Sequence, residues 1–332
     1  MIIIERRIFS KFGHEPLQID LIKKMINNKL TNIITCKNQK LDFSNNITSP
    51  ILLNYDTVNE GKETNSYIEE NAQILAEYLN YNNFKRKSIF IPSARVMELS
   101  MIVSLLKIID TTYYPKIFIR ILNKGYFDNV NPIFKIKLIS LIKENIISLY
   151  AETEELVFEL NKQYGIICKK LLLPCFIYKQ GEETIFNNKF ELTIGFLGSP
   201  RSNKGISKLP AIIREFRKNF NSDKSKFKIK FLLQIGSLKK RRKIIFFLKE
   251  FLSKHLSHSV KLEIVDNNHN NDDFIKTLKK VDIFLLPYSL KSYRFAGSGF
   301  IIDGVMLNKP IVYTSGIAMY EYLCKGNALS AS

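Results

Sequence analysis

The sequence predicts an α/β protein with two domains, each built on a parallel sheet that helices cover on both faces. Short runs of branched apolar residues alternate with longer segments whose apolar residues recur every three to four positions. This alternation occurs twice along the 332 residues, on either side of a polar stretch without periodicity at residues 179–188. Strands linked by helices form parallel sheets that are buried on both faces.

The length and composition fit two domains of about 150 residues each. Hydrophobic residues make up 45% of the chain, which is enough for two cores. We expect an N-terminal domain at residues 1–178, a linker at 179–189 and a C-terminal domain at 190–332.

In the N-terminal domain, Pro92 is expected to end its strand and Thr153 to cap the helix that follows it. The expected strands are residues 2–5, 33–36, 51–54, 88–92, 116–120 and 146–150, with 171–173 closing the domain. The expected helices are residues 17–27, 63–79, 98–109, 135–143 and 154–164.

The C-terminal domain repeats the alternation, and its last residues, 327–332, are expected to be frayed. The expected strands are residues 191–197, 228–235, 260–265, 282–286 and 310–313. The expected helices are residues 206–220, 239–254, 272–280, a helix from about 299 to 307, and 318–323.

The charge of the chain is strongly positive, at +19. Residues 190–332 hold 25 basic and 11 acidic residues, a net charge of +14, so most of the excess lies in the C-terminal domain. Such a charge suits anionic ligands, an anionic membrane surface or nucleic acid. A composition rich in Lys, Asn and Ile and lacking Trp is the alternative explanation.

Several kinds of site are not indicated. The four cysteines form no C-x-x-C pair and the four histidines have no metal-ligand spacing, so we expect no metal and free thiols in a reducing compartment. There is no P-loop, Asp-x-Asp or G-x-S-x-G motif. No apolar stretch reaches the roughly 18 residues of a membrane-spanning helix.

Two loops of the C-terminal domain follow strands, where open parallel sheets bind ligands. The first contains Gly198, Arg201 and Lys204, which combine backbone freedom with positive charge. The second contains Arg294, then the sequence Gly297, Ser298 and Gly299 at the start of a helix, and Asp303 one turn later. Free amides and the helix dipole favour phosphate at such a helix start.

Residues 190–316 resemble the retaining glycosyltransferases of the GT-B fold, in the family 4 group. The resemblance rests on the Arg201 and Lys204 loop between a strand and a helix, and on an acidic residue followed by G-x-x-x-x-K-P-I-V at residues 304–312. Asp303 stands where the family has the second of two glutamates, and Phe295 where it has the first. Arg294 followed by Ser298 and Gly299 looks like another version of this segment.

The resemblance implies two Rossmann-like domains and transfer of a sugar from a nucleoside diphosphate to a glycan or lipid-linked acceptor. It implies that Lys204, Arg201, Gly198 and the amides of residues 297–299 hold the donor diphosphate. It further implies that Asp303 holds the donor ribose and that Arg294 takes part in catalysis. His14 follows the first strand, where the family often has an acceptor loop, so we expect a catalytic role for it.

The implied reaction is retaining, needs no metal or cofactor, and belongs to cell-surface polysaccharide synthesis. We expect a cytoplasmic protein that contacts the inner face of an anionic membrane peripherally, and no nucleic-acid partner. Relatives continue through further strand–helix units, so the C-terminal domain is expected to be truncated.

Other interpretations remain open at this stage. A nucleotide-sugar epimerase of the same fold is one, and a non-catalytic scaffold or nucleic-acid-binding protein is another. Ser93, Arg95 and Glu98 follow a further strand and indicate either a site or a capped helix. The basic run at residues 239–243 suits anionic lipid, nucleic acid or a solvated helix face.

Overall fold

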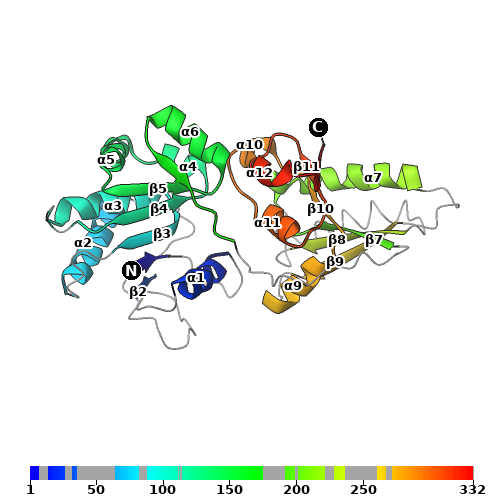
Figure 1. Ribbon diagram of the computed structural model, residues 1–332, viewed down its shortest axis with the longest axis horizontal. Coiled ribbons are helices and arrows are strands. Elements are labelled where there is room, and N and C mark those ends of the chain that lie inside the picture. Colours follow the sequence, from blue (N-terminus) through cyan, green and yellow to red (C-terminus); the bar gives the residue numbers. More distant parts are fainter. Residues whose placement is uncertain are drawn as a thin grey trace. The chain divides into compact units, whose positions relative to one another are not determined.

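The computed structural model describes residues 1–6, 14–26, 32–35, 64–81, 88–110, 112, 114–174, 191–198, 201–220, 228–235, 260–266 and 271–331. The chain divides into two compact units, Met1–Phe176 and Ile177–Ser332, and each contains one six-stranded sheet (Figure 1). The expected α/β class with two parallel sheets is confirmed.

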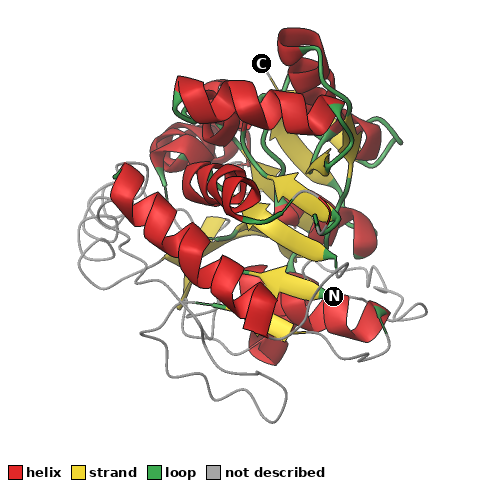
Figure 2. Cartoon of the chain, turned by 90° about the vertical axis from the view of Figure 1, so that its left-hand side faces the viewer, coloured by secondary structure: helices red, strands yellow, loops and turns green. Residues whose placement is uncertain are grey.

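The sheet of the first unit has the strand order β2-β1-β3-β4-β5-β6, and every neighbouring pair is parallel. Figure 2, in which this unit faces the viewer, shows helices on both sides of the strands. Its strands are β1 (Ile2–Ile4), β2 (Asn32–Ile34), β3 (Ile89–Ala94), β4 (Ile117–Ile121), β5 (Ile147–Ala151) and β6 (Cys168–Lys170). Its helices are α1 (His14–Met25), α2 (Asn65–Tyr81), α3 (Val96–Ile108), α4 (Lys124–Asp128), α5 (Pro132–Lys143) and α6 (Glu154–Tyr164).

The strand interiors form the core because their branched side chains are buried on both faces, as the continuous apolar runs predicted. β1 consists of three isoleucines with at most 1% exposure. Ile19 and Ile22 of α1 pack with Ile3 against one side of this sheet. The helix α6 begins as expected, with the Thr153 hydroxyl accepting a hydrogen bond from the Leu156 amide at 3.2 Å.

Several local expectations in the first unit were wrong. Pro92 does not end its strand, because β3 continues to Ala94 through a register irregularity after Ile91, where a proline needs no ladder bond. The helix α1 begins at His14, three residues earlier than expected. The last strand is Cys168–Lys170, and residues 171–173 follow it as a connection.

The second unit has the strand order β12-β11-β10-β7-β8-β9, again entirely parallel. Its strands are β7 (Glu191–Phe196), β8 (Lys228–Ile235), β9 (Val260–Asp266), β10 (Ile283–Leu286), β11 (Ile311–Thr314) and β12 (Ala328–Ala331). Its helices are η2 (Ser202–Lys204), η3 (Ile206–Lys208), α7 (Leu209–Phe220), α9 (Asn271–Lys280), α10 (Leu290–Tyr293), α11 (Gly299–Met306) and α12 (Tyr320–Leu323).

The structure corrects the expected ends of this unit. Residues 328–331 are not frayed, because they form β12 and pair with β11 from Ile311 to Thr314. The helix expected from residue 206 begins as the short turn η3 and becomes α7 only at Leu209. The turn α10 was not expected, since four residues carry too little periodicity to indicate a helix.

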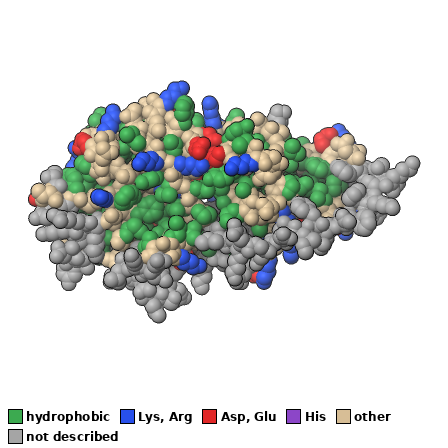
Figure 3. Space-filling model, in the orientation of Figure 1, with side chains coloured by type: hydrophobic (Ala, Val, Ile, Leu, Met, Phe, Trp, Pro, Cys, Tyr) green, Lys and Arg blue, Asp and Glu red, His purple; other side chains and the backbone are tan. Residues whose placement is uncertain are grey.

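Some expectations fall outside the described residues: the strand at 51–54, the linker at 179–189 and the basic helix at 239–254. In the part of the chain that the structure describes, no helix is long and apolar enough to cross a membrane. Figure 3 shows Lys and Arg side chains scattered among apolar and neutral ones on the face in view.

Candidate functional site

The two predicted loops of the second unit meet at one edge of its sheet. β7 and β10 are parallel neighbours, so the loops that follow them leave the sheet on the same side. The Ser289 amide donates a hydrogen bond to the Asn203 carbonyl at 2.8 Å. Gly205 has a φ of +80°, and a Cβ there would lie 2.0 Å from the Pro287 carbonyl oxygen. Only glycine therefore allows the two loops this close an approach.

The first loop begins with a second required glycine. Gly198 has a φ of +90°, and a Cβ on it would lie 2.6 Å from the Lys204 Nζ and 2.6 Å from the Phe300 ring. Its amide donates a hydrogen bond of 2.6 Å to the Oε1 of Gln234, near the end of β8. The loop is thus held from the neighbouring strand while Lys204 folds over its start.

Lys204 is a half-buried cation near the centre of this site. Its Nζ lies 4.9 Å from the centroid of the Phe300 ring, at cation–π distance. Burial, and secondarily the charge of Arg201, lowers the pKa of Lys204 to about 8. Among the described residues, no carboxylate forms an ion pair with Lys204. A cation in this setting is stabilised by an anion that binds to it.

Arg201 and Arg294 are exposed, one on each loop. Arg201 precedes η2, and Arg294 ends α10 with its guanidinium 5.4 Å from the centroid of the Phe295 ring. The second loop is also held by the segment before α12, because the Ala318 amide donates a hydrogen bond to the Tyr293 carbonyl at 2.8 Å. Both arginines are therefore accessible cations, Arg201 on the same loop as Lys204 and Arg294 on the neighbouring loop.

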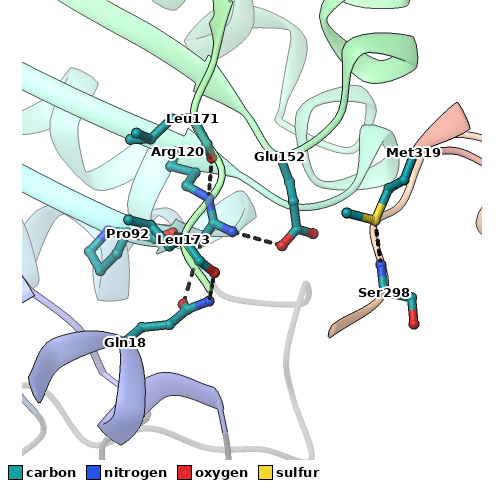
Figure 4. A network of polar contacts seen from close by, with 8 residues as sticks. All are labelled: Gln18, Pro92, Arg120, Glu152, Leu171, Leu173, Ser298 and Met319. Atoms are coloured by element: carbon teal, nitrogen blue, oxygen red, sulfur yellow. Dashed lines mark hydrogen bonds and ion pairs between the residues drawn. The ribbon is translucent and has the colours of Figure 1, made fainter. Parts of the chain in front are cut away.

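The amide of Ser298, one of the predicted phosphate donors, has an acceptor within the protein. That amide donates to the Sδ of Met319 at 3.2 Å, a contact drawn in Figure 4. The Ser298 hydroxyl lies 3.1 Å from the hydroxyl of buried Tyr288, whose ring stacks on Tyr293. Burial raises the pKa of Tyr288 well above its ordinary value, so this hydroxyl stays protonated. Ser298 therefore secures the loop internally.

The helix α11 starts directly after this anchor. Ser298 is its N-cap residue and makes no side-chain capping bond, so the Ser298 side chain satisfies none of the first-turn amides. Gly297 and Gly299 flank Ser298 and are half-buried. Asp303 lies one turn into the helix and is buried, and its charge contributes to the raised pKa of Tyr288.

The predicted residue in the other unit, His14, is the first residue of α1, and its side chain lies outside the described part of the structure. The carboxyl edge of that unit's sheet is organised by Arg120, which is fully buried. Arg120 donates to the carbonyls of Leu171 and Pro92, each at 2.9 Å, and pairs with Glu152 at 2.7 Å (Figure 4). These contacts tie β4 to β3 and to the segments that follow β5 and β6.

Sequence reasoning missed the residues that support the loops. Gln234 could have been found, since it lies at the carboxyl end of the strand next to β7. Phe300 and Met319 gave no signal, because an apolar side chain beside a loop looks like any core residue. Among the described residues, no cluster of His, Cys, Asp or Glu could hold a metal ion.

Comparisons with known proteins identify the fold. No family model and no curated protein matches the sequence. The solved structure of trehalose-6-phosphate synthase OtsA matches with a TM-score of 0.65 at 10% identity, over 99% of this chain and 87% of that one. The E. coli trehalose-6-phosphate structure bound with UDP-2-fluoro glucose matches with a TM-score of 0.65 at 11% identity, over the same shares. Sucrose-phosphate synthase from Thermosynechococcus elongatus matches with a TM-score of 0.61 at 12% identity, over 95% of this chain and 80% of that one. The fold is therefore the GT-B type, with two Rossmann-like units.

Proposed function

We propose that the protein is a glycosyltransferase that moves a sugar from a nucleoside-diphosphate sugar to a glycan or lipid-linked acceptor. The observation that carries the proposal is Lys204, a half-buried cation without a carboxylate partner among the described residues, where the β7 and β10 loops meet. One of the similar structures is bound with UDP-2-fluoro glucose, which supports a nucleotide-sugar donor here.

In this proposal Lys204, Arg201 and Arg294 hold the donor diphosphate together with the amides at the start of α11. Gly198, whose own amide is bonded to Gln234, leaves room for the donor beside Lys204. Negative charge grows on the diphosphate as the bond to the anomeric carbon breaks, so fixed cations lower the barrier without a metal. The acceptor hydroxyl oxygen forms the new bond to the anomeric carbon, and its proton passes to the departing diphosphate oxygen. Gly297 and Gly299 contribute amides, while the engaged amide of Ser298 does not in this state.

The remaining roles belong to the proposal as well. Asp303, one turn into α11, would accept hydrogen bonds from the donor ribose. His14, at the start of α1, would contact the acceptor. The proposal also includes retention of configuration at the anomeric carbon. It places the protein in the cytoplasm at an anionic membrane face, in cell-surface polysaccharide synthesis.

Nucleoside-diphosphate binding and donor turnover test the proposal. A ligand that binds the folded state raises the melting temperature, so a panel of nucleoside diphosphates and their sugars should contain at least one stabilising pair. Glycosyl transfer or slow donor hydrolysis is then expected. Epimer formation would support the epimerase instead. Salt-sensitive nucleic-acid binding without donor binding would support a nucleic-acid-binding protein.

A further inference from the structure

The sheet of the first unit has its own topological switch point. The strand order β2-β1-β3 means that the chain leaves β1 to one side and returns on the other. Ligands in open parallel sheets bind outside the carboxyl ends of the two strands where the order reverses. Here those ends carry Arg6 after β1, and Ser93 and Arg95 at the end of β3.

One buried carboxylate joins the two sides of this point. Glu98 accepts from the Nε of Arg6 at 2.5 Å with one oxygen and from the Arg95 amide at 2.9 Å with the other. Glu98 and Arg6 are nearly fully buried. The β3–α3 junction is therefore held in one geometry, and both Glu98 oxygens are already engaged.

Ser93 lies two residues before Arg95, and its buried hydroxyl has no hydrogen-bond partner. The residue is 4% exposed. Buried polar atoms without protein partners are rare in folded proteins, and some of them serve to bind an ion or a ligand.

The neighbours of Ser93 supply further donors. α3 starts at Val96, and the first-turn amides of a helix lack acceptors within it. Arg95 precedes the helix, and its guanidinium lies 5.2 Å from the centroid of the Tyr126 ring, at cation–π distance. Glu5 is also buried at this edge and has contacts of its own. The Ser93 hydroxyl and the first-turn amides of α3 are thus donors at a helix N-terminus, which suits an anion.

We infer that Ser93, Arg95 and the first turn of α3 bind a phosphate or carboxylate group of the acceptor substrate. Glu98 and Arg6 act as positioning residues beneath it. The assignment of this anion to the acceptor rests on the proposed function, whereas the anion site itself does not. A phosphorylated sugar and a lipid phosphate both carry the required group.

Binding is measured by calorimetry with inorganic phosphate, a hexose monophosphate, the neutral hexose and a short-chain prenyl phosphate. At least one organic phosphate should bind, and the neutral hexose should bind much more weakly. Arg95→Gln should weaken phosphate binding about tenfold, since a charge-assisted contact is lost. Lys143→Gln, at the exposed end of α5, is the matched charge control and should change nothing.

Ser93→Ala separates a ligand contact from a structural role. A structural serine would lose stability on this change, whereas an unpartnered hydroxyl should not, so the variant should keep its melting temperature and still bind phosphate several-fold more weakly. Phosphate affinities that stay unchanged in both variants overturn the inference, as does binding of the neutral hexose as tight as that of its phosphate. Nucleoside-diphosphate affinity, measured in parallel, reports on the second unit alone and tests the proposed function separately.

Discussion

The carboxyl edges of the two sheets use charge in opposite ways. In the first unit, buried Arg6 and Arg120 are paired with Glu98 and Glu152. In the second unit, Arg201, Lys204 and Arg294 form no ion pair with any described residue. Paired charges hold an edge together, whereas the desolvated charge of Lys204 raises the energy of the empty site until an anion binds. Stability and ligand affinity should therefore respond to different cations.

The largest effect is expected at Arg120. Arg120→Ala leaves Glu152 and two carbonyls without their partner, and breaking a buried pair costs about 3–5 kcal/mol of unfolding free energy. This loss is measured by unfolding the protein in increasing urea and following hydrogen exchange in peptides from the first unit. Lys124→Ala is the control, because its pair with Glu159 is partly exposed and should contribute less than about 1 kcal/mol. Similar losses in both variants would contradict the assigned role of Arg120.

Lys204 should show the opposite behaviour. Lys204→Ala removes a charge-assisted contact worth about 1.5–3 kcal/mol, so nucleoside-diphosphate affinity should fall roughly 10- to 100-fold. The melting temperature should hardly change, since no paired carboxylate is left behind. Calorimetry on this variant is compared with Lys208→Ala, an exposed lysine four residues along. Equal affinities in the two variants would leave Lys204 without a role in binding.

The sequence predicted where the two loops would meet but not what holds them. Gly198, Lys204 and Asp303 could be singled out as candidates because strand ends and loop glycines follow simple rules that need no tertiary contact. β12 was missed because the pairing that orders residues 328–331 comes from β11, far from any local signal. The engaged amide of Ser298 was missed for the same reason, since its acceptor is the sulfur of Met319, 21 residues away.

A third test uses pH to isolate the contribution of the Lys204 charge to ligand binding. Because the pKa of Lys204 is lowered to about 8, this lysine is charged below that pH and loses its proton as the pH rises through it. Its protonated fraction falls from about nine tenths at pH 7 to about one tenth at pH 9, so nucleoside-diphosphate affinity should weaken about tenfold over this range.

Two variants check the source of that pH dependence. Lys204→Ala should remove it, since no titrating amine remains. Lys204→Arg should bind equally at both pH values, because a guanidinium keeps its proton. Calorimetry at pH 7 and pH 9 measures all three proteins. A wild-type affinity that is constant across the range would mean that Lys204 does not contact the ligand.

The smallest effect is expected at Gln234, which holds the first loop without carrying charge. Gln234→Ala removes the acceptor of the Gly198 amide, and one neutral hydrogen bond is worth about 1 kcal/mol, so diphosphate affinity should fall about threefold to tenfold. Gln234→Glu keeps an acceptor oxygen and should restore the amide's protection from hydrogen exchange. It also places a carboxylate near the Lys204 loop, which should raise the pKa of Lys204 and move the pH dependence upward. If Gln234→Ala leaves both the affinity and the exchange of the Gly198 amide unchanged, the loop is held by its contacts with the β10 loop instead.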